Sequence, residues 1–583
     1  MSAVPQSFAT TSAFEILGPV MVGPSSSHTA GALRCARVAA TLVEGVVSSV
    51  TFTLWNSFAH TYRGHGTDRA LVAGVLGLDT DDERIRDAFS LAHEAGLNFA
   101  FEIGGDDPSI HPNTVDIHLE SAAGTATDVR GESLGGGKMR ISAINGVAVE
   151  ISGLYTTLFV AHRDAPGALA ALTGALAQAR MNIAFCRTYR TEAGGTAYSV
   201  FETDGAPDRA VLPAVRALDL VTYATFIELP GSAAALGPGV STPDLFDDAA
   251  QLLDACRERG ASIGAVMRER EEQMVGAERA RALMRRVIEV MREETTEPLA
   301  HPQRSLGGFL NGEARAVDQA RNALSATLLG AVQSEAVARA MAVLERSATM
   351  GVIVAAPTAG SAGVVPGCVL AVGDALDARA CGEAQTAVGQ AASGGAAANP
   401  LSADGTDTAR DSSSDDPRAC DPHGASAKDA MLEEALYCAA AVGLILSTSA
   451  CVAGAEGGCQ AEVGSAAAMA AAALVQMHGG TPEQALDAAS ITIANLLGLV
   501  CDPVGGLVEV PCQNRNAIGV AAAFTGAQLA LSGVRSLVPF DEMAATMLAV
   551  GHALPATLRE TAQGGIAIAP TALSACARCG MCS

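Results

Sequence analysis

"TTLFVAHRDAPGALAALTGALAQARMNIAFCRTYR" (residues 156–190) is the segment that decides the fold of the middle of the chain. It predicts a strand, an Ala- and Leu-rich helix and a second strand, with Pro and Gly at the first strand–helix junction. The residues that follow predict a turn, "TEAGG", and then a strand, a helix and a last strand, "TAYSVFETD", "DRAVLPAVRAL" and "VTYATFIEL". The resulting order over residues 155–230, βαββαβ, is that of a ferredoxin-like domain.

On the N-terminal side of this segment, residues 14–153 predict an α/β or α+β domain. Strand-like alternation and one amphipathic helical pattern occur in turn along this part of the chain. An Asn-Gly pair between two alternating apolar runs is a strong hairpin signal. The predicted elements are strands at 47–55, 98–103 and 114–120, a helix at 81–96, and a hairpin over 139–153 around Asn145-Gly146.

On the C-terminal side, residues 243–583 predict a mostly helical domain with one strand-like run, "GVIVAAP" (351–357). The uncharged run 436–455 is long enough to span a bilayer. Its Ala-, Gly-, Ser- and Cys-rich composition favours a buried core helix instead. Residues 391–427 lack apolar periodicity and are rich in Gly, Ser, Asp and Pro, which predicts a disordered insert. The whole chain is therefore predicted to be a multidomain α+β protein.

Composition and charge exclude some classes of partner. The 583 residues carry a net charge of −25, so no basic surface is available for nucleic acid. The N-terminus shows no basic region followed by an apolar run, so no signal peptide and a cytoplasmic location are expected. In a reducing cytosol the fourteen cysteines are not a disulfide framework, and clustered thiols indicate metal ligands or reactive groups.

The strongest internal pattern is "GGCQAEVGSA" (457–466) followed by "VCDPVGGLVEVPCQNRNA" (500–517). Gly or Pro lies close to each of three cysteines, Cys459, Cys501 and Cys512, so the chain can turn there and aim the thiols at one point. Three thiolates without a local fourth suggest a [4Fe–4S] cluster with one open iron, since such clusters usually have four Cys ligands. Spacing alone leaves open zinc bound by three Cys and water, and also a buried structural set of thiols.

Near the N-terminus, "LGPVMVGPSSSHTAGALRCARVA" (17–39) places three hydroxyls, those of Ser25, Ser26 and Ser27, directly before a predicted amphipathic helix. Hydroxyls and free N–H groups at a helix start bind anions. A substrate carboxylate is therefore the expected ligand, with an ordinary serine N-cap as the alternative.

Three histidines lie in loops of the same N-terminal region, each near Gly or Pro: His28, His65 and His111. Imidazole suits proton transfer near neutral pH, and glycine lets a substrate approach the backbone closely. Together with Asn113 of "SIHPNT" and Lys138 of "GESLGGGKMR", they predict the wall of a pocket.

At this point the chain resembles the iron–sulfur-dependent L-serine dehydratases (L-serine ammonia-lyases). The strings "GPSSSHTAG", "GHGTD", "HPNT" and "GGGK" match the β domain of that family, and "GVIVAAPTAGSAGVVPG", "GAEGGCQAEVGSA" and "CDPVGGLVEVPC" match its α domain. The middle segment resembles an ACT domain through its element order and Asp164-Ala165-Pro166-Gly167. The resemblance covers nearly everything except 391–427, where relatives have a shorter connection. A smaller departure is "STSACVAGAEGG" before Cys459, where relatives often have "NAS".

The resemblance implies that L-serine is dehydrated and deaminated to pyruvate and ammonia, with a [4Fe–4S] cluster on Cys459, Cys501 and Cys512. An open iron would act as a Lewis acid on the serine hydroxyl. His65 is the first candidate for the base that takes the Cα proton, and His28 and His111 are alternatives. Candidate groups that hold the substrate are Ser25, Ser26, Ser27, Asn113, Lys138, Thr358 and Ser361. The alternatives are another cluster-dependent hydro-lyase and a non-catalytic amino-acid sensor built on the ACT domain.

The chain closes on "SACARCGMCS" (574–583), with Cys576, Cys579 and Cys582 at C-x2-C-x2-C spacing. In the resembled family a cysteine near the C-terminus can occupy the open iron, and Cys582 best fits that role. The ACT domain implies an amino-acid or cation ligand and a homodimer. No nucleic-acid or membrane partner is expected.

Overall fold

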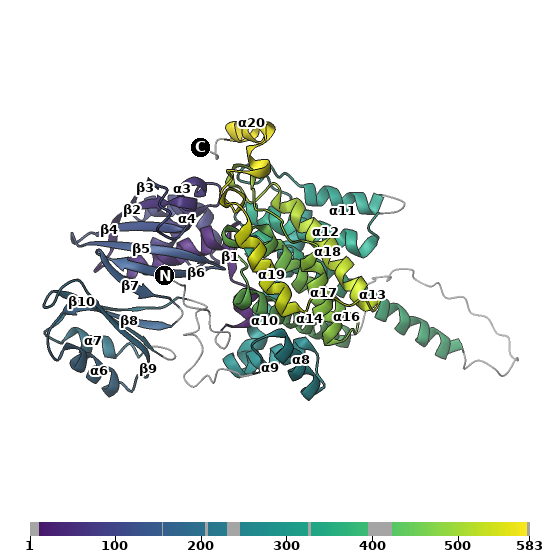
Figure 1. The fold of residues 1–583 in the computed structure, drawn as a ribbon, viewed down its shortest axis with the longest axis horizontal. Helices are drawn as coiled ribbons and strands as arrows, with labels where there is room; N and C mark the ends of the chain where they lie inside the picture. The colour runs from purple at the N-terminus through teal and green to yellow at the C-terminus, as the bar shows by residue number, and fades with distance from the viewer. Residues whose placement is uncertain are drawn as a thin grey trace, which may run out of the picture.

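The computed structural model describes residues 11–153, 155–203, 208–229, 245–323, 328–393 and 422–579. A sheet-rich N-terminal region, a smaller sheet-and-helix region below it and a helical body beside them are the three parts of the molecule (Figure 1). This arrangement confirms the multidomain α+β prediction.

The N-terminal region is built on a six-stranded sheet of order β3-β2-β4-β5-β6-β7, in which only the β2–β3 pair is parallel among the described strands. Helices α2 and α4 pack on each other, and α2 covers β4, β5 and β6. Asn145 and Gly146, both with positive φ, form the predicted hairpin turn. The elements are α1 Ala13–Ile16, β1 Val20–Val22, α2 Ala32–Thr41, β2 Val47–Trp55, α3 Asn56–Thr61, α4 Thr67–Val75, α5 Ala88–Glu94, β3 Asn98–Gly105, β4 Thr114–Ser121, β5 Ala126–Gly135, β6 Lys138–Ile144 and β7 Val147–Ile151.

Two sequence predictions need correction in this region. The helix predicted at 81–96 is divided into a 3-10 turn, Glu83–Asp87, and α5. The run "GESLGGGKMR", predicted to line a pocket, is the end of β5, a tight turn and the start of β6; Leu134, Gly135 and Gly136 line the pocket described below, but Lys138 does not. Gly135, Gly136 and Gly137 all have positive φ, so this glycine run serves the reversal of the chain.

The middle region has the predicted βαββαβ order, with strand order β11-β8-β10-β9. Helices α6 and α7 pack with the apolar residues of one face of this sheet into a separate cluster. The other face contributes Phe159 and Tyr198 to the main core, next to the N-terminal region. The Tyr223 hydroxyl donates to the carbonyl of Thr41 at 2.7 Å. The elements are β8 Thr156–Arg163, α6 Ala168–Gln178, β9 Ile183–Arg190, β10 Thr196–Thr203, α7 Val211–Arg216 and β11 Val221–Ile227.

The helical body surrounds α16, in which every residue from Ser465 to Val475 is buried. Its run of alanines lets α14, α17 and α18 approach closely. The first part of this helical domain, residues 249–300, is three helices, because Gly260 and Gly276 take positive φ and end the first two. The elements are α8 Ala249–Arg259, α9 Ile263–Val275, α10 Ala277–Ala300, α11 Glu313–Ala323, α12 Ala331–Ala348, β12 Val352–Val354, α13 Val364–Ser393, α14 Pro422–Ser449, α15 Gly454–Gly457, α16 Ser465–Met477, α17 Pro482–Ala494, α18 Cys512–Leu531, α19 Phe540–Ala553 and α20 Pro570–Cys579.

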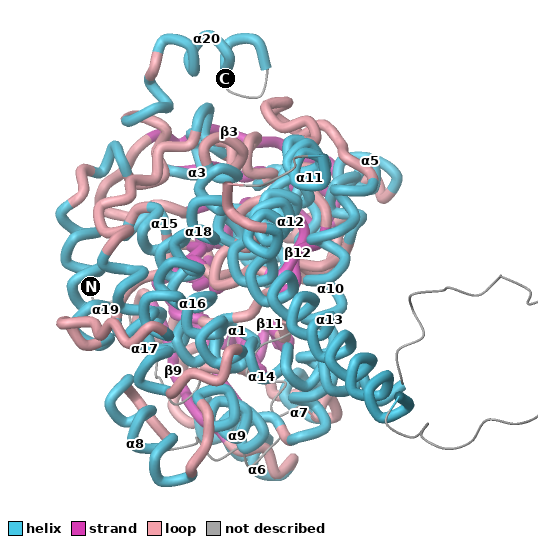
Figure 2. Tube along the Cα trace, turned by 90° about the vertical axis from the view of Figure 1, so that its right-hand side faces the viewer, coloured by secondary structure: helices cyan, strands magenta, loops and turns pink. Residues whose placement is uncertain are grey.

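Two helices of the described chain are long and apolar enough to cross a membrane by length and composition, Ala359–Cys381 and Ala427–Ser449, but most of each is buried inside the fold. The apolar run 436–455 is helical as far as Ser449. Residues 391–393 and 422–427 are also helical, so the predicted insert is shorter than expected at both ends. Its remaining residues, 394–421, lie outside the described part. The end of α13 that leads to them projects from the body (Figure 2).

One short pairing joins the N-terminal region to the helical body. Strands β1 and β12 form a two-stranded antiparallel sheet, with Val20 opposite Val354, Met21 opposite Ile353 and Val22 opposite Val352. Met21 and Ile353 are completely buried. The serine loop follows β1, and the loop with Thr358 follows β12, so this pairing holds the two regions that carry the predicted substrate loops against each other.

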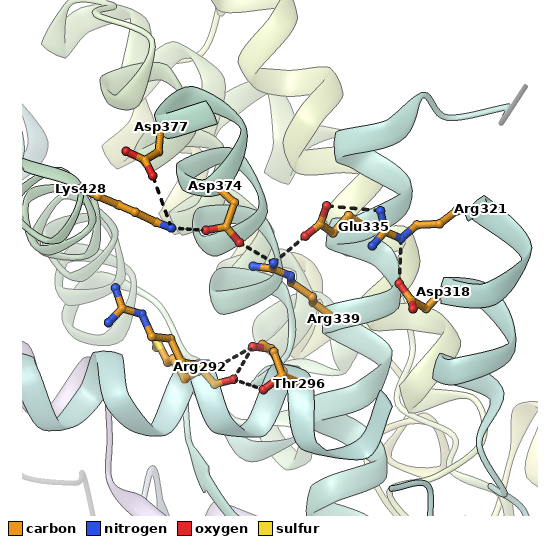
Figure 3. Close-up of polar contacts among 11 residues, drawn as sticks. Arg292, Thr296, Asp318, Arg321, Glu335, Arg339, Asp374, Asp377 and Lys428 are labelled. Carbon is orange, nitrogen blue, oxygen red and sulfur yellow. Dashed lines mark hydrogen bonds and ion pairs between the residues drawn. The ribbon is translucent and has the colours of Figure 1, made fainter. Parts of the chain in front are cut away.

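A network of charged side chains ties α11, α12, α13 and α14 together (Figure 3). Arg339 of α12 lies 2.5 Å from both Glu335 and Asp374, and Lys428 of α14 lies 2.5 Å from the other oxygen of Asp374. Arg321 of α11 extends the network to Glu335 at 3.4 Å. Only 13% of the Arg339 side chain is exposed, so its two ion pairs are less screened than pairs on the open surface.

We expect Arg339→Met to lower the free energy of unfolding by roughly 1–3 kcal/mol, because two carboxylates lose their shared partner. Arg292→Met is the matched control: Arg292 pairs with Asp429 on the surface, and 44% of its side chain is exposed. That variant should lower the free energy of unfolding by less than about 0.5 kcal/mol. Urea unfolding of both variants measures the difference, and equal losses would contradict a role of the network.

Candidate active site

Nine of the predicted site residues line one pocket between the N-terminal region and the helical body. Its volume is about 680 Å³, including the part open to solvent. The N-terminal region contributes Ser25, Ser26, Ser27, His65, His111 and Asn113 to the lining, and the helical body contributes Thr358, Gly360, Glu456, Glu462, Cys501, Cys512 and Glu560.

The serine loop begins directly after β1. Ser25 is the N-cap residue, and its hydroxyl accepts from the backbone N–H of His28 at 3.1 Å. The predicted amphipathic α-helix does not start at once: Ser26–Gly31 is a π-helical turn, and α2 follows it. A second π-helical turn, Gln460–Gly464, follows Cys459 on the other wall. Such turns occur frequently at functional sites.

His65 is completely buried, and its two ring nitrogens have different surroundings. The carbonyl of Thr61 lies 3.2 Å from Nδ1. A carbonyl only accepts, so Nδ1 carries the proton and Nε2 carries the lone pair. Nε2 has no hydrogen-bond partner among the described residues, and the nearest carboxylate oxygen, Oε1 of Glu560, is 4.0 Å away. Burial lowers the pKa of His65 to about 4, so the ring is neutral near pH 7 and can accept a proton at Nε2.

The other two histidines are arranged differently. His28 stacks on His65 with ring centroids 4.2 Å apart. Both of its nitrogens contact hydroxyls, Ser27 Oγ at 3.0 Å from Nδ1 and Ser57 Oγ at 3.0 Å from Nε2. Burial lowers the pKa of His28 well below its usual value. In His111 the Nδ1 atom accepts from the backbone N–H of Asn113 at 3.1 Å, so the neutral ring carries its proton on Nε2. His111 is thus suited to donate a hydrogen bond, and His65 to accept a proton.

The loop after β12 faces the serine loop. Thr358 lines the pocket and donates its hydroxyl proton to Oε1 of Glu462 at 3.0 Å. Ser361 is completely buried and lies behind it, 3.1 Å from the Thr358 hydroxyl. Asn113 is 3% exposed, and its Oδ1 atom has no partner among the described residues. Thr358 and Asn113 therefore present polar atoms to the pocket, whereas Ser361 supports Thr358.

Lys138, a predicted substrate-binding residue, lies away from this pocket. Its ammonium pairs with Glu15 at 3.0 Å and lines a different cavity. The reason is the tight turn of Gly135–Gly137, which places Lys138 at the start of β6.

Three thiols meet at the floor of the pocket. Cys459, Cys501 and Cys512 are 3%, 3% and 7% exposed, and all three are free. Cys459 and Cys501 pack together with Val463, and Cys501 and Cys512 line the pocket. Burial raises the pKa of all three thiols, and the charge of Cys459 raises it further at the other two. Buried, adjacent thiols need a cationic partner to ionise, so this donor set fits a metal centre.

The C-terminal tail is described only in part. Helix α20, which contains Cys576, packs on the turn between Cys501 and Cys512. Cys582, the predicted fourth ligand, lies outside the described residues.

Sequence reasoning missed the acidic residues of the pocket. Glu462 follows Cys459 by three residues, so helical spacing was a usable signal for it. Glu560 has no such signal. Backbone hydrogen bonds with Cys501 place Glu560 at the pocket. The N–H of Cys501 donates to the carbonyl of Leu558 at 2.8 Å, and the N–H of Glu560 donates to the carbonyl of Cys501 at 2.9 Å. Burial raises the pKa of both carboxyls, and the charge of Glu462 also raises the pKa of Glu560.

Comparison with known proteins gives the same three parts. Residues 12–141 match the family described as serine dehydratase beta chain, residues 156–220 match the ACT domain, and residues 258–399 and 419–567 match the serine dehydratase alpha chain. The alpha-chain match is interrupted within the segment expected to be an insert.

Characterised relatives match separate parts of the chain or nearly all of it. The L-serine dehydratase alpha chain of Peptoniphilus asaccharolyticus is 38% identical over 55% of this chain and 94% of its own length. The beta chain of the same organism is 40% identical over 37% of this chain and 98% of its own length. The L-serine dehydratase of Streptomyces coelicolor is 29% identical over 94% of this chain and 96% of its own length. With its beta, ACT and alpha parts fused in one polypeptide, the chain belongs to the L-serine dehydratase family.

Proposed function

We propose that this protein dehydrates L-serine and releases pyruvate and ammonia. The observation that carries the proposal is the placement of a neutral histidine, with a free lone pair on Nε2, in the same pocket as Cys501 and Cys512. The reaction needs a base at Cα and a Lewis acid at the β-hydroxyl. The pocket offers a candidate for the first and a binding place for the second.

A [4Fe–4S] cluster held by Cys459, Cys501 and Cys512 would supply Lewis-acid chemistry at its open iron. The rest of the work is assigned to side chains. Ser25, Ser26 and Ser27 offer hydroxyls, and the start of the π-helical turn offers backbone N–H groups, for the substrate carboxylate. His65 takes the Cα proton at Nε2. His111 and Asn113 orient the substrate by hydrogen bonds, and Thr358 does so from the facing loop.

After loss of the proton and the hydroxyl, the product is an aminoacrylate. It tautomerises and hydrolyses to pyruvate and ammonia in water, so no further catalytic group is required. Release of pyruvate from L-serine by the anaerobically prepared protein would exclude a purely sensory role. A substrate panel of hydroxy acids separates the reaction from that of another hydro-lyase.

We also propose roles for the remaining parts. The ACT domain binds an amino acid or a cation, and the protein acts as a homodimer in the cytoplasm. Cys582 occupies the open position of the cluster when no substrate is bound. If so, Cys582→Ser keeps the visible absorbance of the cluster but changes the rate at which oxygen bleaches it; failure to assemble the cluster would contradict this role.

We expect Cys501→Ala to lose the visible cluster absorbance and pyruvate release together, since one of three ligands is removed. Cys438→Ala is the matched control, because Cys438 is equally buried but lies in α14 and does not line the pocket. The control should keep both properties. Iron and sulfide content, an anaerobic spectrum and a pyruvate assay measure the outcome. A Cys501→Ala protein with a full cluster content would contradict the ligand assignment.

We expect His65→Ala to keep the cluster absorbance and to lower kcat by about 10²–10⁴-fold, because a general base is removed. His60→Ala is the control: His60 lies in α3, shortly before His65 in the chain, but pairs with Asp106 at 2.8 Å on the surface. It should retain kcat. Full activity of His65→Ala would move the role of base to another residue.

A further inference from the structure

The charged groups that line the pocket are carboxylates. Among its described lining residues none is Lys or Arg, whereas three are Glu: Glu560 is buried, Glu462 is partly buried and Glu456 is exposed. Two carboxylates that face one cavity repel each other, and burial makes this repulsion stronger than it would be in water. The arrangement is stable in its ionised form only with a cation between or beside them.

One protein cation acts on the pocket from outside its lining. The guanidinium of Arg515 donates to Asp502 at 2.6 Å; burial raises the pKa of Glu462, and the charge of Arg515 lowers it by a smaller amount. Thr358 gives Glu462 one neutral hydrogen bond, at 3.0 Å. Besides the exposed Glu456, the pocket therefore offers two less exposed carboxylates, Glu462 and Glu560, with no Lys or Arg among its described lining residues.

An independent feature points to a ligand at the same place. Nε2 of His65 is buried and without a partner among the described residues, and 4.0 Å separates it from Oε1 of Glu560. That distance is too long for a hydrogen bond, and buried polar atoms are rarely left unpaired. In an α-amino acid the ammonium nitrogen and the Cα proton are on the same carbon. A substrate whose ammonium contacts Glu560 would thus present its Cα proton near the lone pair of His65.

We infer that Glu462 and Glu560 form an ammonium subsite, which makes the pocket select 2-amino acids over the corresponding 2-hydroxy acids. The inference rests on the proposed function, since it assigns one end of the same substrate. The carboxylate end then lies toward Ser25, Ser26 and Ser27. The backbone supports this role of Glu560, because its φ of 60° is the left-handed conformation that non-glycine residues rarely adopt and that clusters at functional sites.

The test uses two ligands that differ only at this subsite. L-Alanine and L-lactate both lack the β-hydroxyl, and lactate has a hydroxyl where alanine has the ammonium. Calorimetry on the anaerobic, cluster-loaded protein measures the binding of each without turnover. We expect wild type to bind alanine more tightly than lactate. Glu462→Gln and Glu560→Gln should each lower the affinity for alanine about 10- to 100-fold, which corresponds to the loss of a hydrogen bond to a charged group. The affinity for lactate should change little.

The control is Glu271→Gln, which neutralises a buried carboxylate that binds the N–H of Ala13 at 2.8 Å and does not line the pocket. It should leave the affinity for both ligands unchanged. The inference is overturned if wild type does not bind alanine more tightly than lactate. It is also overturned if the two pocket variants lower the affinity for both ligands equally, or for neither. If Glu462→Gln does not fold, Glu560→Gln carries the same expectation. Preference for alanine without pyruvate release from serine would contradict the proposed function and leave the ammonium subsite standing.

Discussion

The pairing of β1 with β12 is the constraint on which the rest of the molecule depends. Three residues of each strand, more than 300 positions apart in the chain, exchange hydrogen bonds in a buried antiparallel pair. The N–H of Ala355 extends the contact by donating to the carbonyl of Pro19 at 3.1 Å. Because the pair is antiparallel, the chain leaves β1 and β12 at opposite ends, and the pairing acts by holding the N-terminal region against the helical body. The pocket lies between these two regions and is lined by both the serine loop and Thr358.

A second constraint comes from the floor of the pocket. Asp502, the residue after Cys501, binds two partners: Arg515 of α18, and the N–H of Ile566 at 2.8 Å. Through these contacts the C-terminal segment lies against Cys501 and brings in Glu560. Asn516 of α18 adds a link to the facing loop, since its side chain donates to the carbonyls of Gly360 and Cys512 and accepts from the N–H of Gly363. The thiols and the substrate loop are thus held in one rigid arrangement.

The electrostatics of the pocket follow from burial. Desolvation disfavours every charged form, which keeps His65 neutral and raises the pKa of the thiols and of the two glutamates. Such groups are costly to leave without a partner, and stable folds usually avoid them. These groups gather in one cavity, next to atoms of His65 and Asn113 that have no partner in the part of the chain that the structure describes, which is the physical sign of a site completed by ligands.

The sequence by itself determined the classes of structure and the chemical groups. Periodicity predicted the βαββαβ segment, the Asn145-Gly146 hairpin and the helical body, because local hydrogen bonding and burial of one face leave a direct pattern. The motifs predicted His65, Asn113, Cys501 and Cys512, all of which line one pocket. Only the tertiary structure decided which groups meet. In the folded chain Lys138 lines a different cavity, Ser361 lies behind Thr358, and Glu560 lines the pocket. These positions depend on contacts between segments far apart in the chain, which no local pattern encodes.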